Sequence, residues 1–176
     1  MSARRGGSFG DLVRSLLVLL AGVGVLIAIT PRPQGEAVRV VDVAAPLAQA
    51  RQTAPYDVLA PSGLGARWRP TSARVRVVGD GRHRWQVGFL TPHEQYAALV
   101  QSNEDPGEFV AAQAKGAVSA GSDVIGGKRW IRLANDAGNH RVLWRPATGS
   151  TVVLAGTASW AELGNLAASL RVAGGK

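Results

Sequence analysis

The sequence predicts an α+β protein in which an N-terminal transmembrane helix is followed by one antiparallel β-sheet domain with two packed helices. Three observations lead to this fold class. An uncharged apolar run occupies residues 15–31, runs that alternate apolar with polar residues begin near residue 71, and two helix starts with capping residues follow those runs. The chain has 176 residues, so the part beyond the apolar run has the size of one ordinary domain.

The apolar run contains 17 residues between Arg14 and Arg32. This is the short end of what spans a hydrocarbon core of ~30 Å as a helix, and snorkelling of Arg14 lengthens it. Retention as an anchor is favoured over cleavage as a signal peptide, because the best cut site has the unsuitable Thr30 before it and Pro31 after it. A buried helix of a soluble protein is the other alternative, and the lack of a polar face argues against it.

The charges before the apolar run predict its orientation. Arg4, Arg5 and Arg14 outweigh the single Asp11, which places the N-terminus in the cytoplasm by the positive-inside rule and the remaining chain outside. We therefore expect a single-pass protein of the cell membrane. Its expected parts are a cytoplasmic N-terminus (1–14), a transmembrane anchor (15–31), a tether (32–46) and an extracytoplasmic α+β domain (47–176).

The domain is expected to open with a short helix and three strands. Residues 46–54 can form the helix, and a segment with three prolines and two glycines follows it. The run "SARVRVVG" (72–79) alternates valine with arginine, and "RWQVGFLT" (84–91) places Trp85, Val87 and Phe89 on one face, so the two runs predict a hairpin. The run "QYAALVQS" (95–102) predicts the third strand.

The same order of elements then occurs a second time. Residues 73–115 and 129–170 each predict three strands and a capped helix, with Asp105 and Ser159 as the two N-caps and a glutamate three residues after each. Aligning His83 with His140 suggests a duplicated βββα unit whose two helices cover one apolar face of the sheet. Chance similarity between two amphipathic hairpins is the alternative. The segment "SDVIGGKRW" (122–130) adds a strand or turn before the second unit.

Three stretches of the chain resemble a known family. They are "SLLVLL" after Arg14, "PYDVLAPSGLGARWRPTSARV" (55–75) and "VGFLTPHEQYAALVQS" (87–102). These stretches resemble the single-pass actinobacterial membrane proteins of the domain of unknown function 4245 family, and the resemblance covers nearly the whole chain. It implies an inner anchor and an extracytoplasmic domain, and it implies no activity that can be assigned to any residue.

The sequence indicates no catalytic, cofactor or metal site. The chain has no cysteine, which excludes disulfides, thiolate metal sites and a cysteine nucleophile. A metal site built on His83 and His140 would require adjacent strands and a nearby carboxylate such as Asp80 or Asp136, and solvated histidines beside turns are the favoured interpretation. His93 has no second histidine at metalloprotease spacing, and no nucleophile elbow or phosphate loop follows a strand.

Positive charge is the remaining functional signal. The net charge is +8, and 17 basic against 11 acidic residues lie beyond residue 14. In the predicted compartment the anionic partners are lipid headgroups, wall polymer or another envelope protein, and no nucleic acid is expected. A basic surface typical of an arginine-rich proteome is the alternative.

The expected ligand-binding residues lie around one tryptophan. Trp68 stands between Arg67 and Arg69 in a proline-bounded segment, and an indole between guanidinium groups can hold a sugar or an anionic partner. Arg74 and Arg76 on the polar face of the next strand add positive charge. The sequence thus predicts an envelope binding or scaffolding module, and an envelope hydrolase or transferase with an unrecognised site is the alternative function.

Overall fold

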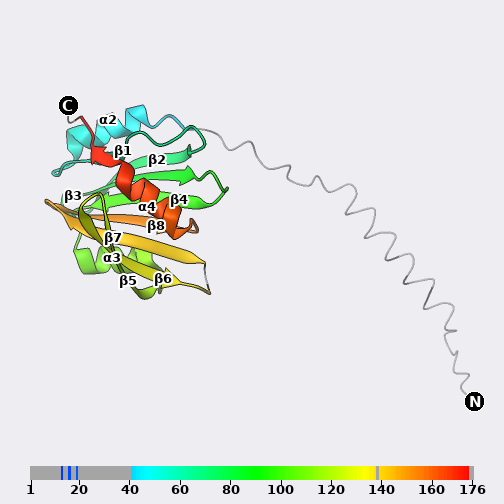
Figure 1. Ribbon diagram of the computed structural model, residues 1–176. Coiled ribbons are helices and arrows are strands. Elements are labelled where there is room, and N and C mark those ends of the chain that lie inside the picture. The colour runs from blue at the N-terminus through cyan, green and yellow to red at the C-terminus, as the bar shows by residue number, and fades with distance from the viewer. Residues whose placement is uncertain (1–12, 14–15, 17–18, 20–40, 138, 175–176) are drawn as a thin grey trace, which may run out of the picture. The chain divides into compact units, whose positions relative to one another are not determined.

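The computed structural model of the chain describes residues 13, 16, 19, 41–137 and 139–174 (Figure 1). The chain divides into two compact units, Met1–Ala37 and Val38–Lys176. The predicted anchor lies outside the described residues except for Leu16 and Leu19, and so does most of the predicted tether. Within the described ranges, no helix combines the length and apolar character needed to cross a membrane.

The described part of the second unit is an α+β domain with an antiparallel sheet and three helices. The helices are α2 (Ala44–Thr53), α3 (Pro106–Ala114) and α4 (Trp160–Ser169). The strands are β1 (Leu59–Pro61), β2 (Arg69–Val78), β3 (Arg82–Leu90), β4 (Tyr96–Ser102), β5 (Val118–Ile125), β6 (Lys128–Asn135), β7 (His140–Ala147), β8 (Ser150–Gly156) and β9 (Leu170–Val172). The prediction of an α+β fold with an antiparallel sheet is confirmed. An additional strand, β5, precedes the second predicted repeat (129–170).

A three-stranded meander (β2 to β4) and a four-stranded meander (β5 to β8) join at the centre of the main sheet. The strand order is β2-β3-β4-β8-β7-β6-β5, and β4 pairs with β8 in antiparallel register. The predicted hairpin corresponds to β2 and β3, in which Val75 pairs with Trp85 and Arg74 with Gln86. A separate two-stranded sheet pairs β1 with β9, which the sequence did not predict because each strand has only three residues.

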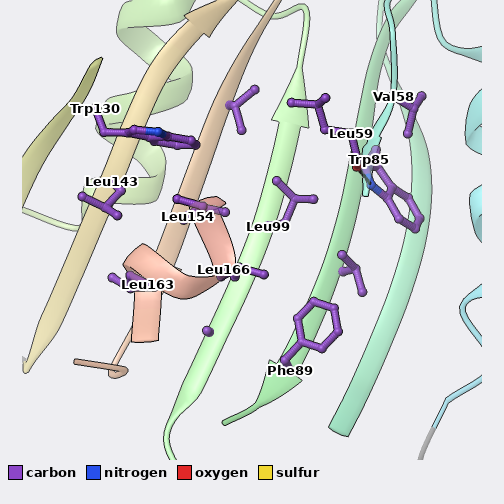
Figure 2. Packing of buried hydrophobic residues seen from close by; sticks show 14 of the residues in the cluster. Val58, Leu59, Trp85, Phe89, Leu99, Trp130, Leu143, Leu154, Leu163 and Leu166 are labelled. Carbon is purple, nitrogen blue, oxygen red and sulfur yellow. Dashed lines mark hydrogen bonds between the residues drawn. The ribbon is translucent and has the colours of Figure 1, made fainter. Parts of the chain in front are cut away.

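Both faces of the main sheet are buried against helices. On one face, Leu99 of β4 and Leu154 of β8 belong to the same apolar cluster as Leu163 and Leu166 of α4 (Figure 2). Residues of α2 join this cluster, and α4 crosses the same face in Figure 1. The other face forms a second cluster around Phe109 of α3. The sheet therefore lies between α4 and α2 on one side and α3 on the other.

The prediction that both capped helices cover one apolar face is wrong. Six of the seven residues of β4 are buried, so this central strand presents apolar side chains to both faces and each face requires a cover. The alignment of His83 with His140 is also wrong, because the two side chains lie on opposite faces of the sheet. His83 shares the face of Trp85, because residues two apart in a strand point the same way, whereas His140 Nε2 lies 2.8 Å from the carbonyl of Gln113 in α3. The two predicted repeats (73–115 and 129–170) therefore share their order of strands and helix, but their helices lie on opposite faces of the sheet.

Both helices begin where the capping residues predict. In α3 the Asp105 carboxylate accepts the amide hydrogen of Glu108 at 3.0 Å, with Pro106 in the first turn. In α4 the Ser159 hydroxyl accepts the amide hydrogen of Glu162 at 3.2 Å, and the Glu162 carboxylate accepts that of Ser159 at 3.1 Å. The second arrangement is a complete capping box, which satisfies two otherwise free donors at once.

Candidate functional site

Two of the predicted site residues form a row on an edge of the main sheet. Arg74 and Arg76 lie on β2, the first strand in the sheet order, and both are exposed. Arg76 pairs with Arg84 of β3, whose guanidinium lies 5.4 Å from the ring centre of Phe109 in α3. The register therefore directs Arg74 and Arg76 to the α3 face of the sheet. We call these two residues the β2 arginine row.

The β2 arginine row has no carboxylate partner within the part of the chain that the structure describes. The contrast with the neighbouring strand is clear, because Arg84 donates to both Glu104 oxygens at 2.7 and 2.8 Å. Burial raises the pKa of Glu104, but hydrogen bonds from Ser102 and Arg84 outweigh burial and lower the pKa. The charge of Arg84 is thus compensated inside the protein, whereas the charges of Arg74 and Arg76 are available to a partner.

The other three predicted residues lie apart from this row. Trp68 is half-buried and packs edge-on against Phe89, with ring centres 6.1 Å apart, on the face covered by α4. Arg69 lies 3.9 Å from Glu94, an exposed pair of the kind that contributes little to stability. Arg67 is exposed. The structure therefore brings Arg74 and Arg76 together and places Trp68 on the opposite face of the sheet.

A second basic cluster, which the sequence did not predict, surrounds Trp130. Trp130 is 1% exposed, and the guanidinium of Arg145 on the neighbouring strand lies 5.1 Å from its ring centre. The two residues border a hollow of about 310 Å³. We call it the Arg145 hollow; its lining is Leu59, Ile125, Gly126, Lys128, Trp130, Arg145, Ala167, Ala168, Leu170, Arg171 and Val172.

Arg145 is a partly buried cation without a carboxylate partner among the described residues. One of its terminal nitrogens, Nη1, donates to the carbonyl of Pro146 at 3.0 Å, and its Nε is buried without a hydrogen-bond acceptor. Burial lowers the pKa of Arg145, since the surroundings solvate its charge less well than water does. The only sequence signal for this site was a tryptophan, an arginine and a proline in succession at residues 144–146, which repeats the order at 68–70.

A histidine and a carboxylate meet at the start of α4. His93 Nδ1 lies 2.9 Å from Oε1 of Glu162, which is 5% exposed, while the His93 side chain is 78% exposed. Burial raises the pKa of Glu162, but hydrogen bonds from Thr91, His93 and Ser159 outweigh burial and bring the pKa to about 2. An ionised carboxylate that orients an imidazole is an arrangement used in acid–base chemistry. His93 does not line the Arg145 hollow.

The remaining histidines do not approach each other. His83 is the second residue of β3, and His140 is the first residue of β7. In the sheet order, β4 and β8 lie between those two strands. Across the described ranges, no group of three or more histidine, aspartate or glutamate side chains is placed to hold a metal ion.

Comparison with known proteins identifies a family. No match to the chain is found among the curated proteins. The family model described as "Protein of unknown function (DUF4245)" matches residues 4–170, a range that covers the apolar run, all three described helices and nearly every strand. With almost its entire length matched, the chain belongs to the DUF4245 family.

Proposed function

We propose that the chain is a binding or scaffolding module of the cell envelope, anchored in the membrane by residues 15–31, whose outer domain contacts an anionic surface through the β2 arginine row. The observation that carries this proposal is the exposure of Arg74 and Arg76 on one face of an edge strand without a carboxylate partner in the described chain. The partner is an anionic lipid headgroup, wall polymer or the acidic face of another envelope protein.

The spacing of the two arginines suits a surface with repeated anionic groups. Residues two apart in a strand lie about 7 Å apart on the same face, so Arg74 and Arg76 can contact neighbouring groups at the same time. Each arginine near an anionic membrane contributes about 1 kcal/mol, and the attraction acts over a Debye length of ~10 Å at 0.1 M salt. The proposal therefore requires weak binding that decreases with salt.

The test is cosedimentation of residues 38–176 with vesicles that contain either an anionic or a neutral phospholipid, and with isolated wall polymer. Circular dichroism first confirms that this compact unit unfolds cooperatively when expressed alone. We expect binding to an anionic surface at low ionic strength, loss of binding at high ionic strength, and no binding to neutral vesicles. Failure to bind any anionic surface at low ionic strength would contradict the proposal.

The alternative function, an envelope hydrolase or transferase, is favoured by one observation. His93 is held by the ionised Glu162 and keeps most of its ring exposed, as a general base would. The test is hydrolysis of a panel of activated esters by the wild type and by His93→Gln. Turnover that disappears in His93→Gln while the fold persists would support the enzyme, and equal background rates would remove it.

A further inference from the structure

We propose that the Arg145 hollow binds a small organic anion, namely a carboxylate or a phosphate monoester with a short apolar group. The anionic group contacts Arg145 and Lys128, and the apolar group lies against the hydrophobic lining of the hollow. This site is separate from the β2 arginine row, because Arg145 and Trp130 lie on the α4 face of the sheet.

The charge of the lining selects an anion. Three cations, Lys128, Arg145 and Arg171, border the hollow, and its lining includes no aspartate or glutamate. Arg171 donates to the carbonyls of Ala168 and Leu170, which fixes its position but leaves its charge uncompensated. Convergent cations with low-dielectric walls raise the local concentration of anions.

The position of Arg145 prepares it to bind a planar anionic group. Its guanidinium is held by Trp130 on one side and by the carbonyl of Pro146 through Nη1, and the other terminal nitrogen, Nη2, has no hydrogen-bond partner within the described ranges. A guanidinium that is already oriented loses little further freedom when it binds a carboxylate or phosphate. Partial burial without a counterion costs free energy, and a bound anion offsets that cost.

Arg132, like Arg145, has its guanidinium next to a tryptophan ring, but its charge is compensated within the protein. It lies on β6 with Trp130, and its guanidinium lies 4.0 Å from the ring centre of Trp160. Unlike Arg145, it forms an ion pair with Asp123 at 3.1 Å. Arg132 is paired with a carboxylate and does not line the hollow, so it is the control for Arg145.

The size and the lining of the hollow limit the ligand. A volume of about 310 Å³ is at the lower end of the range of ~300–1,000 Å³ found for small-molecule pockets. The lining offers apolar surface from Leu59, Ile125, Leu170 and Val172, which an inorganic ion alone would leave exposed to water. Lys128 and Arg145 also line two further hollows, one of which Asp57 borders as well. The lining of the Arg145 hollow has both an apolar wall and cations without a carboxylate.

The experiment is calorimetric titration of the full chain, in a non-ionic detergent, with monobutyl phosphate and with butyrate. Inorganic phosphate tests the anionic group alone, butanol tests the apolar group alone, and dihexanoyl phosphatidylglycerol tests a lipid source of the same chemistry. We expect saturable binding of at least one of the two butyl anions, weaker binding of inorganic phosphate and none of butanol. Tighter binding of the lipid than of the butyl anions would assign the anion to a membrane headgroup, and the reverse order to a soluble ester.

The variants locate the site. Arg145→Gln should weaken binding about tenfold or more, the effect of removing a charge-assisted hydrogen bond, whereas Arg132→Gln should retain the wild-type affinity. If circular dichroism shows that Arg145→Gln is unfolded, Lys128→Gln, which alters an exposed residue, takes its place. No binding of any anion by the wild type, or equal affinities of the wild type and the folded hollow variant, would overturn the proposal. Arg145→Gln should leave vesicle binding through the β2 arginine row unchanged, because Arg74 and Arg76 lie on the opposite face of the sheet, so failure of this proposal and failure of the proposed function give different results.

Discussion

Gln101 is a polar residue in the centre of the sheet, and all of its side-chain atoms are used. It is 0% exposed, its carbonyl accepts the amide hydrogen of Leu59 at 2.8 Å, and its amide donates to the carbonyl of Asp57 at 2.9 Å and the hydroxyl of Ser150 at 3.0 Å. It therefore joins the start of β1 and the residues just before it to the central strand β4. A buried polar group is tolerated only when its partners are in place.

We predict that Gln101→Leu lowers the free energy of unfolding by about 2–4 kcal/mol, because it leaves the buried amide of Leu59 without an acceptor and removes two further hydrogen bonds. The control is Gln86→Leu on the neighbouring strand β3, where the side chain is half-buried. That change should stay within about 1 kcal/mol of the wild type. Chemical denaturation measures both, and equal midpoints for the two variants would contradict this role of Gln101.

Glu162 should make the fold sensitive to acid. Its pKa is about 2 in the folded chain, below the ordinary 4.5, so its ionised form stabilises the fold above pH 4.5 and this contribution disappears as the pH falls from about 4.5 to about 2. We predict that Glu162→Gln costs about 2–3 kcal/mol at neutral pH and that the difference from the wild type shrinks over that interval. The control is Glu108→Gln at the same position of α3, whose side chain is exposed, and this variant should stay within about 0.5 kcal/mol of the wild type. A difference between wild type and Glu162→Gln that does not change with pH would show that the charge is not responsible.

At the scale of elements, the two helix starts allow a direct comparison. Ser159 and Glu162 cap each other, whereas Asp105 accepts a hydrogen bond from the amide of Glu108 without one in return. We predict that Ser159→Ala destabilises the domain by about 0.5–2 kcal/mol and that Asp105→Ala costs less. The larger effect arises because Ser159→Ala also removes a hydrogen bond to the buried Glu162 carboxylate. An unchanged denaturation midpoint for Ser159→Ala would mean that this cap contributes nothing to the helix.

The elements that sequence patterns predicted are those with a local signal. The runs of alternating residues predicted β2 and β3, and the capping residues located the starts of α3 and α4 within one residue. Strand β4 was predicted too, but its apolar residues on both faces were not recognised as the reason for a helix on each side. Strands β1 and β9 had no local signal, because they pair residues that are more than a hundred positions apart.

The candidate sites, too, were predicted only where neighbouring residues in the sequence carry the signal. The β2 arginine row was predicted because the alternation of a single strand is enough to place Arg74 and Arg76 on one face. The Arg145 hollow was missed because β6, β7 and β9 each contribute one of its cations, and only the tertiary fold brings these strands together. Trp68 was predicted as a partly exposed ligand contact and is half-buried, but its packing against Phe89 of β3 was not predicted, because the two residues are far apart in the sequence.

At the scale of the whole molecule, the first prediction concerns the N-terminus. We predict that the mature chain retains residues 1–31, because Thr30 and Pro31 flank the best cut site and both oppose cleavage. The intact mass of the protein extracted from membranes should equal that of the full sequence. A mass that corresponds to a new N-terminus near Pro31 would show that the chain is cleaved and released.

The most direct test of the central claim, that the β2 arginine row binds an anionic surface, is cosedimentation of two charge-matched double variants of residues 38–176 with anionic vesicles at low ionic strength. One carries Arg74→Gln with Arg76→Gln, and the other carries Arg51→Gln with Arg129→Gln, which removes the same charge from exposed positions elsewhere. At about 1 kcal/mol for each arginine at the surface, the first variant should bind about ten- to thirtyfold more weakly than the wild type. The second should lose no more than about twofold through its lower net charge. Equal losses in the two variants would contradict the claim, because binding would then depend on total charge and not on this row.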